Sequence, residues 1–252
     1  VRRFAAIGSG TGGEHVRAAT AARQRWFTLM GTLGGKWPHT QSITPGGSSR
    51  GIDAAERIRL LAKLRELRGF LESTLFAASL DEVAALPDEA ALQAWHAADP
   101  MRGDLRLFLT IAADVGLDRL GPGPGRYLSV GAYRQADGGH ALTAGVWHAA
   151  SQTLAAVDLG AITEDATHAW LRQSAGPLHP REGLTVPEVD KPDAYSWNKA
   201  PRLAGEVIET GAIARQLASG QPLVRDAVAR CGGTVYTRVL ARLVELARVL
   251  PM

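Results

Sequence analysis

The residue with the most intrinsic chemistry in this 252-residue sequence is its one cysteine, Cys231. A thiolate is both a nucleophile and a ligand for soft metals. Arg230 precedes Cys231, and Gly232-Gly233 lead into a predicted helix, a setting that stabilises a thiolate. A nucleophile also needs a nearby base, and the pattern favours an ordinary cysteine between two helices. A single cysteine excludes an internal disulfide framework and a metal cage built from thiolates of this sequence.

Histidines and glycines supply weaker candidates for chemistry. No two of the histidines fall four residues apart on one predicted helix, so the spacing does not indicate an HExxH-type zinc site, and a site built from scattered histidines stays an alternative. The seven are His15, His39, His96, His140, His148, His168 and His179. Gly8-x-Gly10-x-x-Gly13 matches the letters of the dinucleotide fingerprint. A nucleotide site also needs an acidic residue about 20 positions later, and none occurs between Glu14 and Asp53. The sequence therefore favours a flexible glycine-rich segment over a nucleotide-binding loop.

Composition places the chain among ordinary globular proteins. Hydrophobic residues make up 46% and charged residues 21%, which argues for one or two folded domains and against disorder. The net charge is +3, with basic and acidic residues mixed along the chain, so no nucleic-acid surface is indicated. No run reaches the roughly 18 apolar residues that a membrane helix needs, and the first residues make a poor signal peptide. We expect a cytoplasmic protein without membrane insertion.

The elements that must position these residues are mostly helical. Apolar residues recurring every three or four positions predict helices over 14–33, 52–78, 80–86, 89–97, 103–115, 205–219, 222–230 and 233–250. Short strands are predicted over 127–130, 141–147 and 153–157, with a hairpin turn at Asp137-Gly138-Gly139. Residues 163–173 fit a helix or an extended run, and 174–205 are expected to be irregular. The sequence therefore predicts a mainly α fold with a small antiparallel β insertion at about 126–158. Candidate core residues include Phe27, Leu61, Leu64, Phe70, Phe108, Trp170, Trp197 and Val239.

Two segments are more specific than these patterns. Residues 33–39 read LGGKWPH and are followed by Pro45-Gly46-Gly47. Residues 195–202 read YSWNKAPR and are followed by Glu209-x-Gly211-x-x-Ala214-Arg215. Together they resemble the [NiFe]-hydrogenase large-subunit family, which carries a GGKxPH…GG loop after a long helix and a later YSWxKAPR…ExGxxAR segment. Three further runs resemble that family in the same order: YLSVG at 127–131, ITE…HAW at 162–170 and LHPxxGxTxP at 178–187.

The resemblance spans roughly residues 14–250 and implies one large-subunit-like domain over 1–252. That family holds its metal pair with four cysteines, in one CxxC near each end. Cys231 lies in neither context, and the sequence begins after the first CxxC region and ends before the closing one. Carboxylates and imidazoles replace thiolates poorly at a soft-metal centre. The resemblance therefore implies no catalytic residue, no metal ligand and no stably bound nickel–iron centre, and it leans away from an enzyme.

The subgroup that this pattern resembles is the HupK-type hydrogenase maturation proteins, which look like shortened, degenerate large subunits. The resemblance implies a scaffold or chaperone whose partners are the hydrogenase large subunit and other maturation proteins, with a transient Fe(CN)2CO unit as cargo. Since cations and hydrogen-bond donors steady an anionic cyanide complex, the candidate contact residues are Lys36, His39, Lys199 and Arg202, with Cys231 as the first thiol to consider. The structural alternative is that these residues fix turns, fill the core or cap carbonyls.

Two other functions stay open. The sequence is consistent with a truncated or fragmentary hydrogenase large subunit, whose intact form oxidises hydrogen with nickel. It is also consistent with a relative of the quinone-site subunit of respiratory complex I. The Gly-Gly-Lys-x-Pro-His and Lys-Ala-Pro-Arg strings favour the hydrogenase side.

Overall fold

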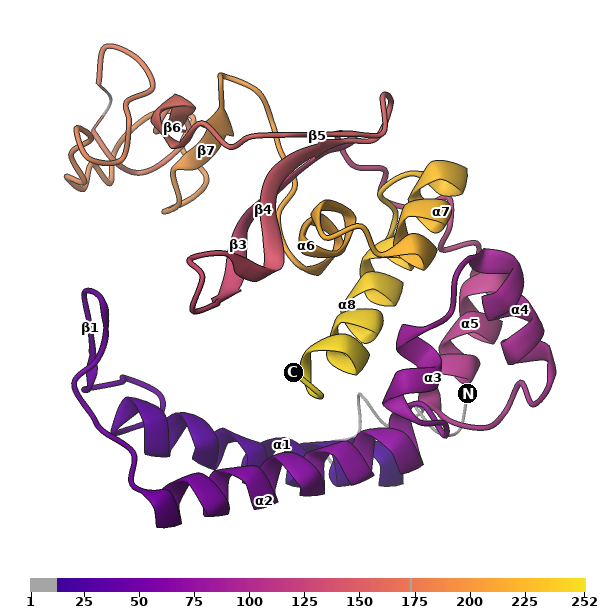
Figure 1. Cartoon of the computed structure of the whole chain (residues 1–252). Helices are drawn as coiled ribbons and strands as arrows, with labels where there is room; N and C mark the ends of the chain where they lie inside the picture. Colours follow the sequence, from indigo (N-terminus) through magenta and orange to yellow (C-terminus); the bar gives the residue numbers. More distant parts are fainter. Residues whose placement is uncertain (1–12, 173) are drawn as a thin grey trace. The chain divides into compact units, whose positions relative to one another are not determined.

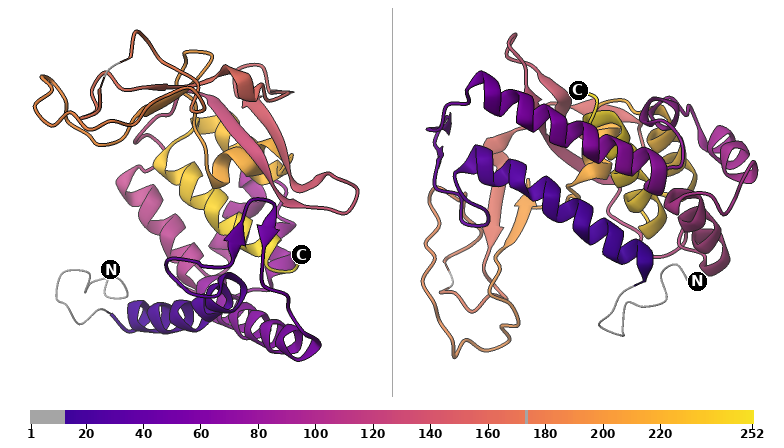
Figure 2. Two further views of the ribbon diagram at one scale, coloured as in Figure 1. Left: turned by 90° about the vertical axis from the view of Figure 1, so that its left-hand side faces the viewer. Right: turned by 90° about the horizontal axis from the view of Figure 1, so that it is seen from below.

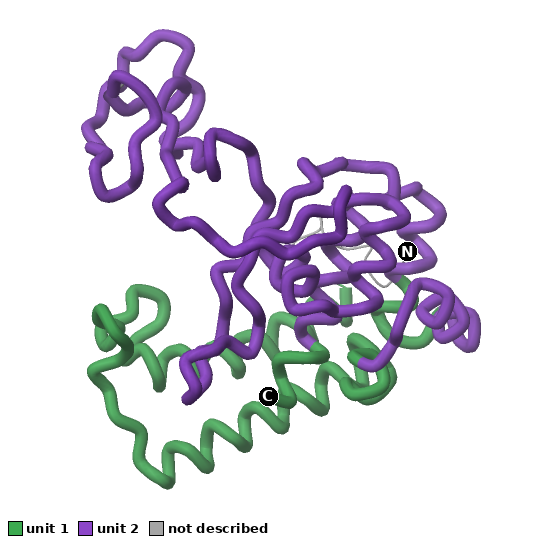
Figure 3. Tube along the Cα trace, turned by 45° about the horizontal axis from the view of Figure 1, so that its top comes forward, with its two compact units in different colours: residues 1–84, 101–107, 247–252 green, residues 85–100, 108–246 purple. Residues whose placement is uncertain are grey.

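The computed structural model describes residues 13–172 and 174–252 (Figure 1). The chain forms two compact units (Figure 3). Unit 1 comprises Val1–Ala84, Met101–Leu107 and Ala247–Met252, and unit 2 comprises Ala85–Pro100 and Phe108–Leu246. The single large-subunit-like domain over 1–252 stays a prediction. The glycine-rich segment 8–12 lies outside the described residues.

The predicted fold class is confirmed: helices predominate and the sheets are small and antiparallel. The helices are α1 (Glu14–Gly34), α2 (Ala54–Phe70), η1 (Leu71–Leu75), α3 (Leu80–Ala84), α4 (Glu89–Ala97), α5 (Asp104–Val115), η2 (Leu159–Ala161), α6 (Ala212–Ala218), α7 (Pro222–Cys231) and α8 (Val235–Val249). The strands are β1 (Ile43–Thr44), β2 (Gly47–Ser48), β3 (Arg126–Arg134), β4 (His140–His148), β5 (Thr153–Ala155), β6 (Ile162–Asp165) and β7 (Ala200–Leu203).

Unit 1 is built on the pair of long helices α1 and α2, which lie side by side (Figure 2). α1 ends where Gly35 adopts the left-handed conformation (φ 74°) that glycine takes without strain. α2 begins with a capping box: the Asp53 carboxylate accepts from the Glu56 amide (2.6 Å), and the Glu56 side chain accepts from the Asp53 amide (3.3 Å). Local sequence therefore fixes both ends of the connection between the helices.

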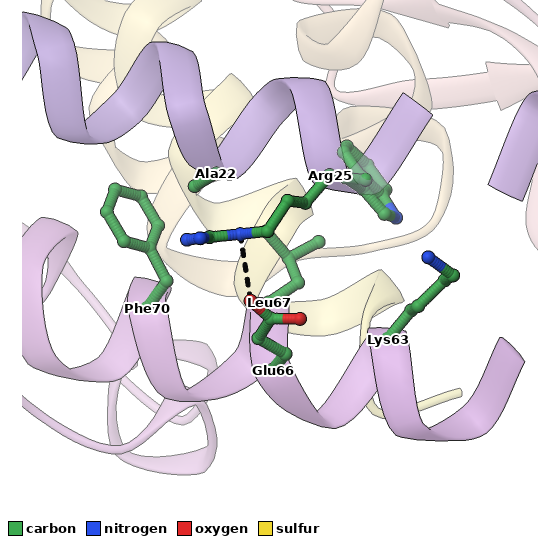
Figure 4. A pocket seen from close by; sticks show the side chains of 7 residues that line it. Ala22, Arg25, Lys63, Glu66, Leu67 and Phe70 are labelled. Atoms are coloured by element: carbon green, nitrogen blue, oxygen red, sulfur yellow. Dashed lines mark ion pairs between the residues drawn. The ribbon is translucent and has the colours of Figure 1, made fainter. Parts of the chain in front are cut away.

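The contact between α1 and α2 is narrow. Arg25 and Glu66 form an ion pair of 2.8 Å across it, beside a cavity of about 20 Å³ lined also by Ala22, Leu67 and Phe70 (Figure 4). No residue of α2 is buried, and the predicted core residue Leu61 is 42% exposed. The prediction for Leu61 was wrong because α1 covers only part of the apolar face of α2 within this unit.

Unit 2 centres on a three-stranded antiparallel sheet in the order β3-β4-β5. The β3–β4 hairpin turns at the predicted place, where the Asp137 carboxylate accepts from the Gly139 amide (2.8 Å). α6 packs against β3 and β4 (Figure 1). Large fully buried side chains of this unit are Leu92, Tyr127, Leu142, Leu217, Leu223 and Leu240. The β strands thus supply one side of a core that helices complete.

Residues 174–205 are mostly irregular, as expected, but they contain β7, which pairs with β6 in a two-stranded antiparallel sheet. The open choice over 163–173 is decided for residues 163–172, which have an extended start followed by turns and isolated bridges, while residue 173 lies outside the described residues. The predicted helix over 205–219 begins only at Ala212. Its first part is extended because Glu209 bridges to Tyr127 in parallel fashion. The predicted core residue Trp197 is 54% exposed, so that prediction was wrong.

Among the described helices, none is both long enough and apolar enough to cross a membrane.

Candidate functional site

The loop after α1 is tied to the end of that helix by its own backbone and by serines. The Gly34 carbonyl accepts from the amides of Gln41 (2.9 Å) and Ser42 (3.1 Å). The Leu33 carbonyl accepts from the hydroxyls of Ser42 (2.9 Å) and Ser48 (3.2 Å). These bonds satisfy helix-end carbonyls that have no partner inside the helix. A Cβ on Gly34 would lie 2.8 Å from the Thr40 methyl, so a larger residue here would displace Thr40.

The two candidate contact residues of this loop are exposed. Neither the Lys36 nor the His39 side chain makes a hydrogen bond or ion pair within the residues that the structure describes, and both are exposed. Between them, Trp37 stacks on Phe27 with ring centroids 5.5 Å apart, and the Arg23 guanidinium lies 4.5 Å from the Phe27 ring on its own helix. The loop therefore holds its backbone and its tryptophan in place and presents two basic side chains to solvent.

The sequence was expected to contain no Gly-x-Ser-x-Gly motif, and that expectation was wrong, because this loop contains one match. Gly47-Ser48-Ser49-Arg50-Gly51 fits the Gly-x-Ser-x-Gly spelling of a nucleophile elbow. That motif needs its serine on a sharp turn between a strand and a helix. Here Ser49 donates its hydroxyl to the Ser42 carbonyl (3.2 Å), and α2 begins only at Ala54. The geometry is that of a loop anchor.

In unit 2, three family-like runs meet at Glu164 of β6. Its backbone exchanges hydrogen bonds with Leu178 (2.8 and 3.3 Å) and pairs in register with Pro201 of β7. Its carboxylate forms an ion pair of 3.1 Å with the Lys199 ammonium, whose side chain is 13% exposed. A Cβ on Gly183 would lie 3.5 Å from that ammonium. Lys199 thus has a structural partner, and its role as a contact residue stays a prediction.

Aromatic pairs join the neighbouring runs. His168 stacks on Tyr195 (5.4 Å between centroids), and Trp170 lies tilted against Trp197 (5.3 Å). The Lys191 ammonium donates to the carbonyls of Ala166 (2.6 Å) and Leu171 (2.9 Å). These contacts order a segment that has little regular secondary structure.

Arg202 is half-buried on β7, opposite Thr163, and donates to the carbonyl of Pro201 (2.9 Å). The nearby Asp165 carboxylate accepts from both the hydroxyl (2.5 Å) and the amide (2.7 Å) of Thr167. These hydrogen bonds, helped by the charges of Arg202 and His168, lower the pKa of Asp165.

The ExGxxAR run has a structural role that sequence alone did not reveal. Glu209 accepts two hydrogen bonds from the Arg238 guanidinium of α8 (2.5 and 2.9 Å). Arg215 donates two to Glu245 of the same helix (2.9 and 2.6 Å). Because planar Arg–carboxylate forks fix orientation as well as distance, they hold α8 against α6 and the preceding segment. Partners 29 and 30 residues away leave no signal in a single sequence.

Cys231 is the last residue of α7, and its surroundings disfavour the thiolate form. The sulfur donates to the Ala227 carbonyl (3.2 Å), and burial together with the carboxylates of Glu89 and Asp118 raises the thiol pKa. Of the two alternatives for Cys231, these contacts favour the ordinary cysteine between helices over the stabilised thiolate. Nor does the described part of the chain bring together three or more His, Cys, Asp or Glu side chains placed to hold a metal ion. These residues do not fit a nickel–iron centre.

The candidate residues are distributed over both units. Lys36 and His39 share one loop of unit 1. Lys199 and Arg202 lie together at β7 in unit 2, while Cys231 closes α7 of the same unit. Each unit therefore holds part of the predicted contact set.

Comparison with known proteins agrees with this arrangement of motifs. The model of the family described as nickel-dependent hydrogenase matches residues 14–249. The chain is 23% identical over 228 residues to the Hydrogenase-2 large chain of Escherichia coli K12, an alignment that covers 88% of this chain and 38% of that protein. The [NiFeSe] hydrogenase of Desulfomicrobium baculatum superposes with a TM-score of 0.66 at 19% identity, over 99% of this chain and 54% of that one. That of Desulfovibrio vulgaris Hildenborough gives 0.63 at 20% identity, over 99% and 53%.

The chain belongs to the nickel-dependent hydrogenase family, and its fold is that of part of a hydrogenase large subunit. It spans 38% of the curated relative and about half of each solved chain.

Proposed function

We propose that this chain is a non-catalytic, HupK-type accessory protein that acts in the cytoplasm during assembly of a [NiFe]-hydrogenase large subunit. Its partners would be the large subunit and other maturation proteins. The observation that carries the proposal is a contrast within the chain. The family's body and loops are kept, whereas the one thiol is bonded to a helix carbonyl and has a raised pKa. A chain with these residues offers contacts to a metal unit or to a partner without trapping the metal.

The cargo that we propose is an Fe(CN)2CO unit, held briefly. Cyanide ligands make such a unit an anionic hydrogen-bond acceptor, and Lys36 and His39 present donors on an anchored loop. Arg202 is the second-loop residue that best fits the same role, because Lys199 already pairs with Glu164. None of these groups binds iron through a thiolate, so the unit would leave when a large subunit offers its cysteines.

Infrared spectroscopy tests whether the chain carries this iron unit. The chain is purified without oxygen from cells that contain the hydrogenase maturation machinery, and the iron-bound carbonyl and cyanide bands are measured against iron content. We expect bands in proportion to protein, weakened by the pair Lys36→Met with His39→Ala and unchanged in Lys63→Met, a lysine on α2. A blank spectrum from folded protein would discard the cargo and leave a chaperone that contacts only protein.

The second candidate is a segment of a hydrogenase large subunit. The coverage favours it, since the chain matches only 38% of its curated relative. The test is the mass of the native polypeptide, together with the DNA on both sides of the coding region. Flanking Cys-x-x-Cys segments in one reading frame would support a large subunit, and a native chain without them supports the accessory protein. The quinone-site alternative stays a prediction.

A further inference from the structure

A pocket of unit 2 is bounded by α4, by α5 and the turn that follows it, and by the start of α8. Its volume is about 350 Å³, at the lower end of the range for small-molecule sites. α5 supplies its apolar side, and the other elements supply its polar groups. The residues that line it, all of unit 2, are Glu89, Gln93, Leu109, Ala112, Ala113, Asp118, Arg119 and Tyr236.

The Glu89 carboxylate is bonded at one oxygen and unpartnered at the other. Oε1 accepts from the Tyr236 hydroxyl (2.5 Å) and from the Gln93 side-chain amide (2.9 Å). Oε2 is buried and has no hydrogen-bond partner among the described residues. Leaving a buried carboxylate oxygen without a donor costs stability. This oxygen therefore favours a ligand that brings a hydrogen-bond donor to Glu89.

A second carboxylate, that of Asp118, lines the same pocket. Its side chain is exposed and makes no hydrogen bond or ion pair within the part of the chain that the structure describes. Burial, the hydrogen bond to Glu89 and the charges of Glu89 and Asp118 all raise the pKa of Tyr236. Tyr236 therefore stays a neutral phenol, and the negative charge of the pocket resides on the two carboxylates.

The one cation of the lining does not neutralise these carboxylates. A Cβ on Gly116 would lie 2.6 Å from Nη2 of Arg119, so the guanidinium lies against this glycine. Arg119 forms no ion pair with Glu89 or Asp118 among the described residues. Two carboxylates against one guanidinium leave the lining with a net negative charge, which favours a cationic ligand over an anionic one.

The rest of the lining defines the kind of cation. The described residues bring together no three His, Cys, Asp or Glu side chains placed to hold a metal ion, and Ca²⁺ or Mg²⁺ would need more oxygen ligands than two carboxylates supply. An ammonium group is a compact charge with three donors. Leu109, Ala112 and Ala113 offer apolar surface for the hydrocarbon that carries such a group.

We propose that this pocket binds a primary ammonium group on a short hydrocarbon stem, with Glu89 Oε2 and Asp118 as its acceptors and the apolar side of α5 against the stem. A free small amine and a lysine side chain of a partner protein share this chemistry. The inference does not rest on the proposed function, because no residue of the lining belongs to the predicted contact set.

The probe is n-pentylammonium, titrated into the full chain at pH 7 while NMR follows the Gln93 side-chain amide. That amide donates to Glu89 and so reports on its carboxylate. We expect a saturable shift with a dissociation constant of about 1 mM, a usual value for a ligand of this size. Pentan-1-ol has the same stem without the charge and should bind at least about tenfold more weakly.

Three substitutions locate the binding. Glu89→Gln keeps an oxygen acceptor for Tyr236 and Gln93 but removes the charge, and it should weaken pentylammonium binding about tenfold. Asp118→Asn should weaken it about threefold, since this carboxylate is exposed to solvent. Asp114→Asn removes an exposed carboxylate of α5 that does not line the pocket, and this matched control should bind as the parent does.

The result that would overturn the proposal is an absent saturable shift in the parent, equal binding of pentan-1-ol, or equal effects of the pocket and control substitutions. Asp118→Asn keeps the test valid if Glu89→Gln lowers stability, because its side chain is exposed. Nα-acetyl-lysine N-methylamide then distinguishes the sources. Tighter binding than that of pentylammonium assigns the pocket to a lysine of a partner protein, and equal or weaker binding assigns it to a free amine.

Discussion

The two family-like loops use their charged residues in opposite ways. In the first, hydrogen bonds from Ser42 and Ser48 to Leu33 hold the backbone, and Lys36 and His39 point to solvent. In the second, Lys199 is paired with Glu164, and the following run pairs Glu209 with Arg238. The first loop presents basic side chains to solvent, whereas the second loop and the run after it hold charged side chains in ion pairs that stabilise the fold. A family motif therefore does not by itself identify a contact residue.

The largest expected effect on stability comes from breaking the ion pair between Glu209 and Arg238. Glu209→Gln leaves the Arg238 guanidinium without its counter-charge, with Glu209 only 14% exposed. We expect a loss of about 3 kcal/mol in the free energy of unfolding, measured by urea denaturation with an unchanged m-value. Glu66→Gln, which breaks the exposed pair with Arg25, is the matched control and should stay within about 0.5 kcal/mol. A Glu209→Gln variant as stable as the control would refute the structural role of this run.

Substituting one lysine in each loop, Lys199 and Lys36, compares directly how much each loop's charge contributes to stability. Lys199→Met leaves Glu164 unpaired in a half-buried site and should cost about 1–2 kcal/mol of unfolding free energy. Lys36→Met removes an exposed charge and should change stability by less than about 0.5 kcal/mol. Equal losses of unfolding free energy would contradict the claim that Lys199 has a structural role and Lys36 has none.

Tyr127 gives a pH-dependent test of the packing around Glu209. Burial, together with the charge of Glu209, raises the pKa of Tyr127 to about 12, and its hydroxyl has no hydrogen-bond partner among the described residues. An unfolded tyrosine ionises near pH 10. The stability that Tyr127 contributes is therefore full below about pH 10 and is lost as the pH rises toward 12.

Tyr127→Phe should remove that alkaline loss and, at pH 7, leave stability unchanged or higher by up to about 1 kcal/mol, since a buried polar group without a partner is removed. The measurement is chemical denaturation of both proteins between pH 8 and about pH 12. Parallel pH profiles would show that Tyr127 is not shielded as described.

The smallest effect concerns Asp165, whose pKa is lowered chiefly by its hydrogen bonds to Thr167. A lowered carboxyl pKa contributes stability above its unfolded value, and the contribution is lost as the pH falls through the folded value. Thr167→Val should therefore be less stable than the parent at pH 7, with the difference shrinking below about pH 4. A difference that does not change with pH would assign the effect to packing instead.

The sequence predicted the elements better than their contacts. The helix predicted over 14–33 matches α1 closely, because the glycines at its end are a local signal. The helix predicted over 52–78 begins near the start of α2, but it was predicted too long, since α2 ends at Phe70 and η1 ends at Leu75. Leu61 and Trp197 were wrong as core residues because burial depends on which distant elements cover them. The helix expected from residue 205 began late because Glu209 bridges to Tyr127, a contact across 82 positions of sequence.

The candidate site shows the same limit. Motif spelling singled out Lys36, His39, Lys199 and Arg202, but it could not separate an exposed side chain from one held in an ion pair. That difference lies in partners such as Glu164, 35 residues away from Lys199.

The most direct test of the account is complementation in cells. The coding region is deleted, and hydrogenase activity is measured after return of the parent chain, of the pair Lys36→Met with His39→Ala, or of Lys63→Met. We predict that the parent and Lys63→Met restore activity, whereas the double variant, folded and present at equal amount, restores little. Full activity from the double variant, or no loss on deletion, would contradict the claim that the first loop presents its charges for hydrogenase assembly.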